Sequence, residues 1–145
     1  METITEKQAL KLTFNDYQIE VKQGKVEDFY CEDRKAYIFK SVISVNVNGN
    51  KTRFNFFGSI NDFQNNKSIY DLQELAFCLY CFLSDSLAGQ ESFESFCSEF
   101  GYDNDSIKAL KIHKACMRST VKAEKLFNAS DICEVLNHIQ ENYNC

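Results

Sequence analysis

The chain of 145 residues has no proline, no tryptophan and only five glycines. These absences exclude a proline-rich linker, a collagen-like repeat and a glycine-rich phosphate-binding loop. No apolar run approaches the length of about 18 residues that a membrane-spanning helix needs, and the first residues are polar. We therefore expect neither a membrane span nor a secretory signal peptide. Two histidines and no recognisable catalytic motif give little sign of enzyme chemistry.

Aromatic and hydrophobic residues, by contrast, are plentiful. The chain holds 13 Phe and 7 Tyr and is 44% hydrophobic and 26% charged, a composition typical of a folded globular protein. Its length predicts a single domain over residues 1–145. Strand patterns fill residues 1–66 and helix patterns fill residues 67–145. Because the two kinds do not alternate, the sequence predicts an α+β fold, in which an N-terminal antiparallel sheet of hairpins packs against three to four C-terminal helices.

Seven cysteines are present, an odd number, and most stand at apolar helical positions where a small hydrophobic residue would serve. A secreted disulfide framework would instead use an even set in loops, so we expect a reducing cytoplasm. Cys78 and Cys81 have the spacing of a zinc or redox pair, but they lie in an apolar helix with no second pair. We therefore expect both thiols to pack in the core, with no metal and no other cofactor.

The strand half contains two hairpin patterns. Hydrophobic residues alternate over residues 10–14 and, with the opposite parity, over residues 17–21. A two-residue turn at Asn15-Asp16 explains the change of parity, and a single bulged strand is the alternative. Residues 36–48 alternate over a longer stretch. Asn48-Gly49-Asn50 then predicts a second hairpin turn.

The helical half begins with a predicted cap. Ser68 followed by Asp71 resembles a capping box, and the helix should end near Leu87 with Gly89 beyond it. A short helix over residues 93–100 should follow. We expect it to bury three phenylalanines and to stop at Gly101; these are Phe93, Phe96 and Phe100.

Two further helices complete the prediction. Asp103 or Asp105 is expected to cap a helix over residues 106–127. Ser130 is expected to cap the last one. Its apolar face would carry Ile132, Val135, Leu136 and Ile139.

Charge is distributed in blocks. Residues 67–105 hold one basic residue against eight acidic ones, and residues 106–125 hold six basic residues against one acidic one. On a helix of 100° per residue the six cations fall within an arc of about 120°. They are Lys108, Lys111, Lys114, Arg118, Lys122 and Lys125. The candidate acidic surface consists of Glu91, Glu94, Glu99, Asp103 and Asp105.

The basic stripe has two interpretations. It can be a surface that binds phosphates or an acidic protein, since lysine and arginine displace counterions from such partners. It can also be a solvated helix face without a partner, as charge runs usually are. No zinc finger, RNP-type aromatic platform or Gly-x-x-Gly loop accompanies it, so the sequence indicates no known nucleic-acid module.

Residues 93–106 read F-x-x-F-C-x-x-F-G-Y-D-x-D-S and run into a basic helix with Lys108-Ala109 and Lys114-Ala115. This segment resembles one in a family of small bacteriophage proteins that have no assigned activity. The similarity covers about residues 54–118 and includes Phe56-Phe57-Gly58-Ser59-Ile60. Small acidic phage proteins without catalytic motifs are often inhibitors of host defence, anti-CRISPR proteins among them, so the resemblance implies that kind of function by analogy.

The leading hypothesis is therefore a non-catalytic phage inhibitor in the cytoplasm of the bacterial host. Its expected partner is a CRISPR effector nuclease, which is RNA-guided, or the guide-RNA complex of that nuclease, bound through charged surfaces. Two alternatives remain. One is an accessory protein that binds nucleic acid through the basic helix over residues 106–127, and the other is a small phage enzyme whose site the sequence does not reveal.

Overall fold

In the described residues the four strands come first and all the helices follow, so the α+β prediction is confirmed. Of the described residues, 46% are helical and 30% are in strands. The computed structural model describes residues 8–145. By its internal contacts the chain divides into two units, residues 1–78 and residues 79–145, and the division falls within helix α2 (Leu72–Gly89). Within the described residues, no helix has both the length and the apolar character of a membrane span.

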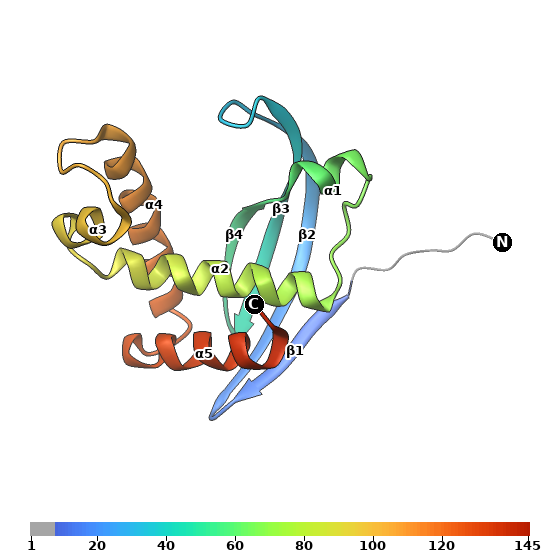
Figure 1. Cartoon of the computed structure of the whole chain (residues 1–145). Helices are drawn as coiled ribbons and strands as arrows, with labels where there is room; N and C mark the ends of the chain where they lie inside the picture. Colours follow the sequence, from blue (N-terminus) through green and yellow to red (C-terminus); the bar gives the residue numbers. More distant parts are fainter. Residues whose placement is uncertain (1–7) are drawn as a thin grey trace. The chain divides into compact units, whose positions relative to one another are not determined.

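The first unit holds a four-stranded antiparallel sheet whose strands neighbour one another in chain order (Figure 1). The strands are β1 (Ala9–Phe14), β2 (Tyr17–Cys31), β3 (Ala36–Val47) and β4 (Asn50–Phe57). Phe14 pairs with Tyr17 across a two-residue turn, so the first predicted hairpin is confirmed and the single bulged strand is wrong. The second hairpin is also confirmed. Asn48 and Gly49 have φ angles of 52° and 92°, and a type I′ turn requires two such positive angles.

Strand β2 continues well beyond residue 21, where the predicted alternation stops. Its pairing with β3 shifts at a β-bulge between Gln23 and Val26. A bulge places two residues opposite one and reverses the parity of the strand. The hydrophobic alternation of the second half of β2 is therefore out of phase with that of the first half. For this reason the sequence pattern did not predict the second half of the strand.

The sheet has an apolar face and a polar face. Val21, Ile43, Val45 and Val47 are fully buried. They share one face, because Val21 pairs with Val45 and alternate residues of a strand point the same way. The opposite face carries mainly polar and charged side chains that are exposed or half-buried.

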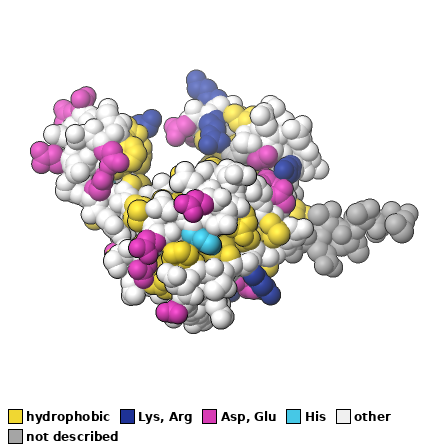
Figure 2. Space-filling view, turned by 60° about the horizontal axis from the view of Figure 1, so that its bottom comes forward, with side chains coloured by type: hydrophobic (Ala, Val, Ile, Leu, Met, Phe, Trp, Pro, Cys, Tyr) yellow, Lys and Arg dark blue, Asp and Glu magenta, His cyan; other side chains and the backbone are white. Residues whose placement is uncertain are grey.

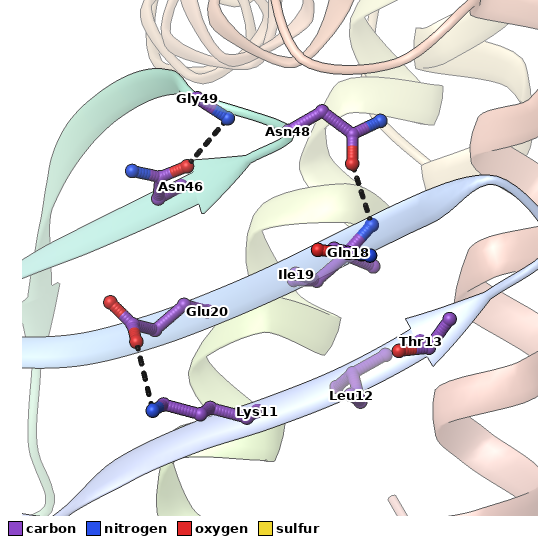
Figure 3. A pocket seen from close by; sticks show the side chains of 9 residues that line it. All are labelled: Lys11, Leu12, Thr13, Gln18, Ile19, Glu20, Asn46, Asn48 and Gly49. Atoms are coloured by element: carbon purple, nitrogen blue, oxygen red, sulfur yellow. Dashed lines mark hydrogen bonds and ion pairs between the residues drawn. The ribbon is translucent and has the colours of Figure 1, made fainter.

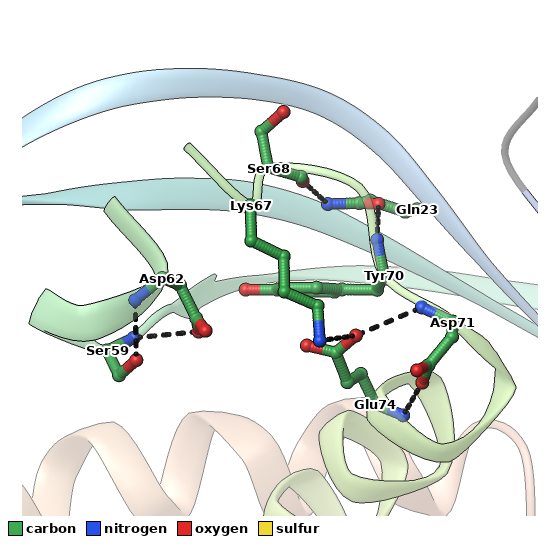
Figure 4. Close-up of polar contacts among 8 residues, drawn as sticks. All are labelled: Gln23, Ser59, Asp62, Lys67, Ser68, Tyr70, Asp71 and Glu74. Atoms are coloured by element: carbon green, nitrogen blue, oxygen red, sulfur yellow. Dashed lines mark hydrogen bonds and ion pairs between the residues drawn. The ribbon is translucent and has the colours of Figure 1, made fainter. Parts of the chain in front are cut away.

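Gln23 ties the segment before α2 to the sheet (Figure 4). Its side chain is only 5% exposed. The amide nitrogen Nε2 donates to the Ser41 hydroxyl at 3.0 Å and to the Ser68 carbonyl at 2.8 Å, and Oε1 accepts from the Tyr70 backbone N–H at 2.9 Å. A buried amide with its partners supplied fixes the position of the loop that leads into α2.

A short helix, α1 (Ile60–Gln64), follows β4 and precedes α2 along the chain. It is absent from the sequence-based prediction. Ser59 and Asp62 form a reciprocal capping box at its start. Its one inward aromatic, Phe63, has its ring centroid 4.9 Å from that of Phe39 and 5.9 Å from that of Tyr37. Helix α1 therefore covers the first residues of β3.

Helix α2 starts one turn later than predicted. Asp71 accepts a hydrogen bond from the Glu74 N–H at 2.9 Å, and the Glu74 carboxylate accepts one from the Asp71 N–H at 3.2 Å. This reciprocal pair is the capping box, so the prediction that Ser68 caps the helix is wrong. Gly89 is the last residue of the helix rather than a residue beyond it.

The second unit contains α3 (Phe93–Phe100), and its bounds match the prediction. Ser92 caps the helix, and Gly101 ends it in the left-handed conformation with φ of 74°. The expectation of three buried phenylalanines is wrong, however. Phe96 is 2% exposed, Phe93 is half-buried and Phe100 is 51% exposed.

Helices α4 (Ile107–Glu124) and α5 (Ile132–Tyr143) follow, with a 3₁₀ turn η1 (Ala129–Asp131) before α5. Both predicted caps are wrong. The Ser106 hydroxyl, and neither Asp103 nor Asp105, accepts from the Ala109 N–H at 3.1 Å. Helix α5 grows out of η1 with no side-chain cap, so Ser130 has no capping role. Of its predicted apolar face, Ile132, Val135 and Ile139 are buried and Leu136 is half-buried.

Within the second unit, α4 packs closely against the end of α2. The Thr120 hydroxyl donates to the Ser86 carbonyl at 2.6 Å, and the Ser86 hydroxyl donates to the Ser119 carbonyl at 3.1 Å. A Cβ atom at Gly89 would collide with the Thr120 hydroxyl and with the Cys116 backbone. This contact sets which side of α4 is buried.

Candidate functional site

The buried side of α4 consists of small or polar residues that admit the close contact with α2. It is formed by Ala109, His113, Cys116, Thr120 and Ala123. Because these positions recur every three to four residues, the intervening positions point away from the contact.

The six predicted cations lie on the other side of the helix. Lys108, Lys111, Lys114 and Arg118 are exposed, Lys122 is half-buried, and Lys125 is exposed just beyond the last helical residue. The structure therefore brings all six to one edge of α4. Whether that edge binds a partner remains a prediction.

Four apolar side chains are exposed on the same helix, and the sequence reasoning missed them. The exposed fractions are 72% for Ile107, 39% for Leu110, 47% for Met117 and 58% for Val121. At 100° per residue, positions 110, 117 and 121 fall within about 40° of one another and border the basic edge. We call these four residues together with the six cations the α4 face. The spacing of Leu110, Met117 and Val121 was the signal that could have revealed it.

The charge of the α4 face is largely uncompensated. Lys108, Lys111, Lys114, Arg118 and Lys125 form no ion pair with any residue in the described part of the chain. A cluster of cations at this density creates a positive potential that attracts anionic groups. The α4 face thus combines exposed hydrophobic surface with five cations that form no ion pair among the described residues.

The predicted acidic residues differ in their exposure. Glu91 is half-buried, and its contact with the Glu99 carboxyl group raises the pKa of Glu91. Glu94, Asp103 and Asp105 are exposed on and after α3. On the face of the molecule drawn in Figure 2, acidic side chains (magenta) are scattered among uncharged ones.

His113 has a structural role in this unit. It is 5% exposed, its Nε2 lies 2.8 Å from the Glu91 carbonyl oxygen, and its ring lies 5.0 Å from that of Phe96 and 5.7 Å from that of Phe93. Because a carbonyl oxygen only accepts, Nε2 carries the proton. That nitrogen is therefore occupied and is not available to activate the Cys116 thiol.

The thiols show no arrangement for metal or redox chemistry. None of the seven cysteines, all of which lie in the described residues, forms a disulfide; Cys78 is buried and Cys81 is half-buried. Burial raises the pKa of Cys81 to about 11 and that of Cys116 to about 11, which keeps both as thiols at neutral pH. Within residues 8–145, no group of three or more His, Cys, Asp or Glu side chains is placed to hold a metal ion.

A small cavity of about 260 Å³ lies in the first unit. Its lining includes Phe56, Phe77, Asp62 and Tyr70. The Tyr70 hydroxyl points toward Asp62 (Figure 4) and has no hydrogen-bond partner among the described residues. Asp62 itself is engaged in the cap of α1. The cavity thus brings one phenol (Tyr70) together with two carboxylates (Asp62 and Glu74) and one guanidinium (Arg34), and no histidine or cysteine lines it.

Comparison with protein-family models, with curated proteins and with solved structures found no match to this chain. The functional argument therefore depends on the α4 face and on the charge pattern of the chain.

Proposed function

We propose that the chain is a non-catalytic binding protein that docks its α4 face onto an acidic, partly apolar surface of a partner protein. The observation that supports this proposal is the exposure of Ile107, Leu110, Met117 and Val121 beside six cations. A phosphate backbone offers charged and polar groups and would leave the apolar residues uncovered, whereas protein interfaces combine an apolar centre with a polar rim. The exposed apolar residues of the α4 face therefore favour a protein partner.

The free energies of the two kinds of contact suggest different roles for the apolar residues and the cations of the α4 face. Full burial of one large apolar side chain contributes roughly 1.5–3 kcal/mol, so four that are about half exposed offer roughly 3–6 kcal/mol to a partner. The cations contribute mainly to specificity and association rate, since they attract an acidic surface and repel a basic one. Affinity would then come from the apolar residues and selectivity from the basic edge.

In its narrower form, the proposal is that the partner is a CRISPR effector nuclease with its guide RNA, and that docking inhibits it. This form is supported by the resemblance of residues 54–118 to small phage proteins. An inhibitor of this kind needs a stable scaffold and charged surfaces and performs no reaction itself. The alternative, an accessory protein that binds RNA through α4 alone, is supported by the six cations but leaves the apolar residues unused.

Target cleavage by a purified, guide-loaded effector nuclease tests the proposal. The intact chain should co-elute with the nuclease and reduce cleavage while the guide RNA stays intact. The double variant Met117→Glu with Val121→Glu should lose co-elution and inhibition, because it places two charges in the apolar part of the interface.

The matched control is Lys35→Glu, a charge reversal at the exposed turn between β2 and β3, which should leave inhibition unchanged. Co-elution that survives Met117→Glu with Val121→Glu but is lost on Lys111→Glu with Lys114→Glu would favour RNA as the ligand of α4. Cleaved or modified guide RNA would instead favour an enzyme.

A further inference from the structure

The polar face of the sheet, which we call the open sheet face, concentrates positive charge on an acidic protein. Strand pairing places its side chains in three cross-strand rows: Lys11, Glu20, Asn46 and Lys51; Lys22, Ser44 and Arg53; Glu27, Lys40 and Phe57. Lys25 joins them through its ion pair with Glu27. Six cations against two carboxylates leave a net of four positive charges, while the whole chain carries −5.

Each carboxylate of this face is shared between two lysines. The ion pairs are Lys11–Glu20 at 3.8 Å, Lys22–Glu20 at 3.1 Å, Lys25–Glu27 at 3.6 Å and Lys40–Glu27 at 3.6 Å. The side chains of Lys11 and Lys25 are each 76% exposed. Because exposed ion pairs contribute little free energy, a phosphate group can take these lysines from their carboxylates at small cost.

Two exposed aromatic rings lie at one end of the same face. Phe29 is 36% exposed and Phe57 is 43% exposed, and their ring centroids are 5.2 Å apart with the planes tilted by 54°. The Lys40 ammonium lies 5.8 Å from the centre of the Phe29 ring. Exposed rings beside a cation are the arrangement on which unpaired bases stack.

The other end of the face offers neutral hydrogen-bonding groups. A depression of about 600 Å³ lies beside Lys11 and is lined by Thr13, Gln18 and Asn46 among others (Figure 3). The Thr13 hydroxyl and the Gln18 side-chain amide make no hydrogen bond to a described residue. Both groups can donate and accept, so they suit the ribose 2′-hydroxyl, which distinguishes RNA from DNA.

We propose that the open sheet face binds single-stranded RNA, with phosphates along the lysine rows and bases on Phe29 and Phe57. A protein partner fits this face less well, because the centre of the face consists of charged rows and its two exposed rings lie at one end, whereas a protein interface has an apolar centre. Duplex RNA fits less well too, since its bases are already stacked and cannot reach the rings. The proposal concerns the first unit and goes beyond the function proposed for α4.

Fluorescence anisotropy of the full chain with a labelled single-stranded RNA of about 12 nucleotides tests this proposal. Three to four phosphate contacts should give a slope of about −2 to −3 for the logarithm of affinity against that of salt concentration. Single-stranded DNA of the same sequence should bind several-fold more weakly. Equal affinity for DNA would overturn the assignment to RNA, and a slope near zero would overturn the lysine rows as phosphate sites.

Variants separate the two parts of the surface. Phe29→Ala with Phe57→Ala should weaken binding on the order of tenfold or more, because stacking is lost. Lys22→Gln with Lys51→Gln changes exposed side chains and should reduce the magnitude of the salt slope by about 1. The lysine variant is expected to preserve the fold. It therefore still tests RNA binding at this face if the phenylalanine variant unfolds.

Two controls complete the experiment. Glu27→Gln removes a competing carboxylate, so it should tighten RNA binding a few-fold. Lys111→Glu with Lys114→Glu changes only α4 and should leave RNA binding unchanged. If the α4 variant abolishes RNA binding while the open-sheet variants bind normally, the proposal is wrong and RNA binds at α4. Failure of the nuclease experiment would leave this outcome unaffected, because the two tests use different surfaces and different ligands.

Discussion

At the scale of single residues, the buried Tyr70 hydroxyl has no hydrogen-bond partner among the described residues. Leaving a buried donor unpaired costs about 1–3 kcal/mol. Tyr70→Phe removes that group and keeps the ring contact with Phe56, whose centroid is 5.9 Å away. We expect this variant to raise the free energy of unfolding by about 1 kcal/mol at pH 7, measured by urea denaturation.

The same residue gives a pH dependence. Burial and, to a lesser extent, the neighbouring Cys78 thiol raise the pKa of Tyr70 to about 12 from a usual value of 10.0. The folded state thus holds the phenolic proton more tightly than the unfolded state does. The resulting stability is complete below pH 10.0 and is lost as the pH rises toward 12. In Tyr70→Phe the loss over this window should be smaller, and an equal loss in both proteins would contradict the assignment.

Residue-level features of this kind are hard to predict from sequence. Gln23 reads as an ordinary exposed strand residue, yet it is buried because Ser41, Ser68 and Tyr70 reach it from distant positions. The turn at Asn48-Gly49 is the opposite case. Asn and Gly both tolerate positive φ angles, so the turn can be predicted from these residues without knowledge of the tertiary structure.

At the scale of elements, the contact between α2 and α4 depends on the absence of a side chain at Gly89. In an exposed helix, Gly→Ala stabilises by up to about 1 kcal/mol. Here the added Cβ would meet the Thr120 hydroxyl and the Cys116 backbone, so we expect Gly89→Ala to destabilise by about 1–3 kcal/mol or more. Thermal denaturation should show a lowered Tm.

Ser84→Ala is the matched control for this prediction, because Ser84 is exposed on the same helix. It should leave the Tm nearly unchanged. A Gly89→Ala protein as stable as the parent would show that α2 and α4 are not in close contact at this point.

The elements themselves were largely predictable, and their ends were less so. Periodicity located β1, β3, β4 and α2 to α5 because each has an apolar face of several residues. The prediction of the cap was wrong where candidate residues stood within one turn of one another. Asp71 rather than Ser68 caps α2, and Ser106 rather than Asp103 or Asp105 caps α4. Helix α1 was not predicted because five residues are too few to show a helical periodicity of apolar residues. The apolar part of the α4 face was missed although Leu110, Met117 and Val121 share one side of the helix, because spacing alone does not distinguish an exposed apolar side from a buried one.

At the scale of the whole molecule, the net charge does not reveal the two basic faces, and the length does not reveal the two units. A net charge of −5 gives no hint that the open sheet face and the α4 face are both basic. The length predicts one domain, and no proline-rich or glycine-rich linker marks a boundary. The division into two units falls inside the continuous helix α2, where a sequence carries no boundary signal.

Thiol labelling provides a test at this scale, since unpaired cysteines of different burial occur in both units. Cys133 is exposed, whereas Cys97 and Cys116 are buried in the same unit. Burial also raises the pKa of the Cys97 and Cys116 thiols, which lowers their reactive thiolate fraction. In the folded chain, iodoacetamide should therefore modify Cys133 first, as measured by peptide mass spectrometry.

Cys97 and Cys116 should react only when residues 79–145 open, so both should gain reactivity at the same urea concentration. Cys78 is buried in residues 1–78 and reports separately on the first unit. Gly89→Ala should shift the labelling of Cys97 and Cys116 together to lower urea concentration. Labelling of Cys97 while Cys116 stays protected would contradict a cooperative second unit, because α3 and α4 would then open independently.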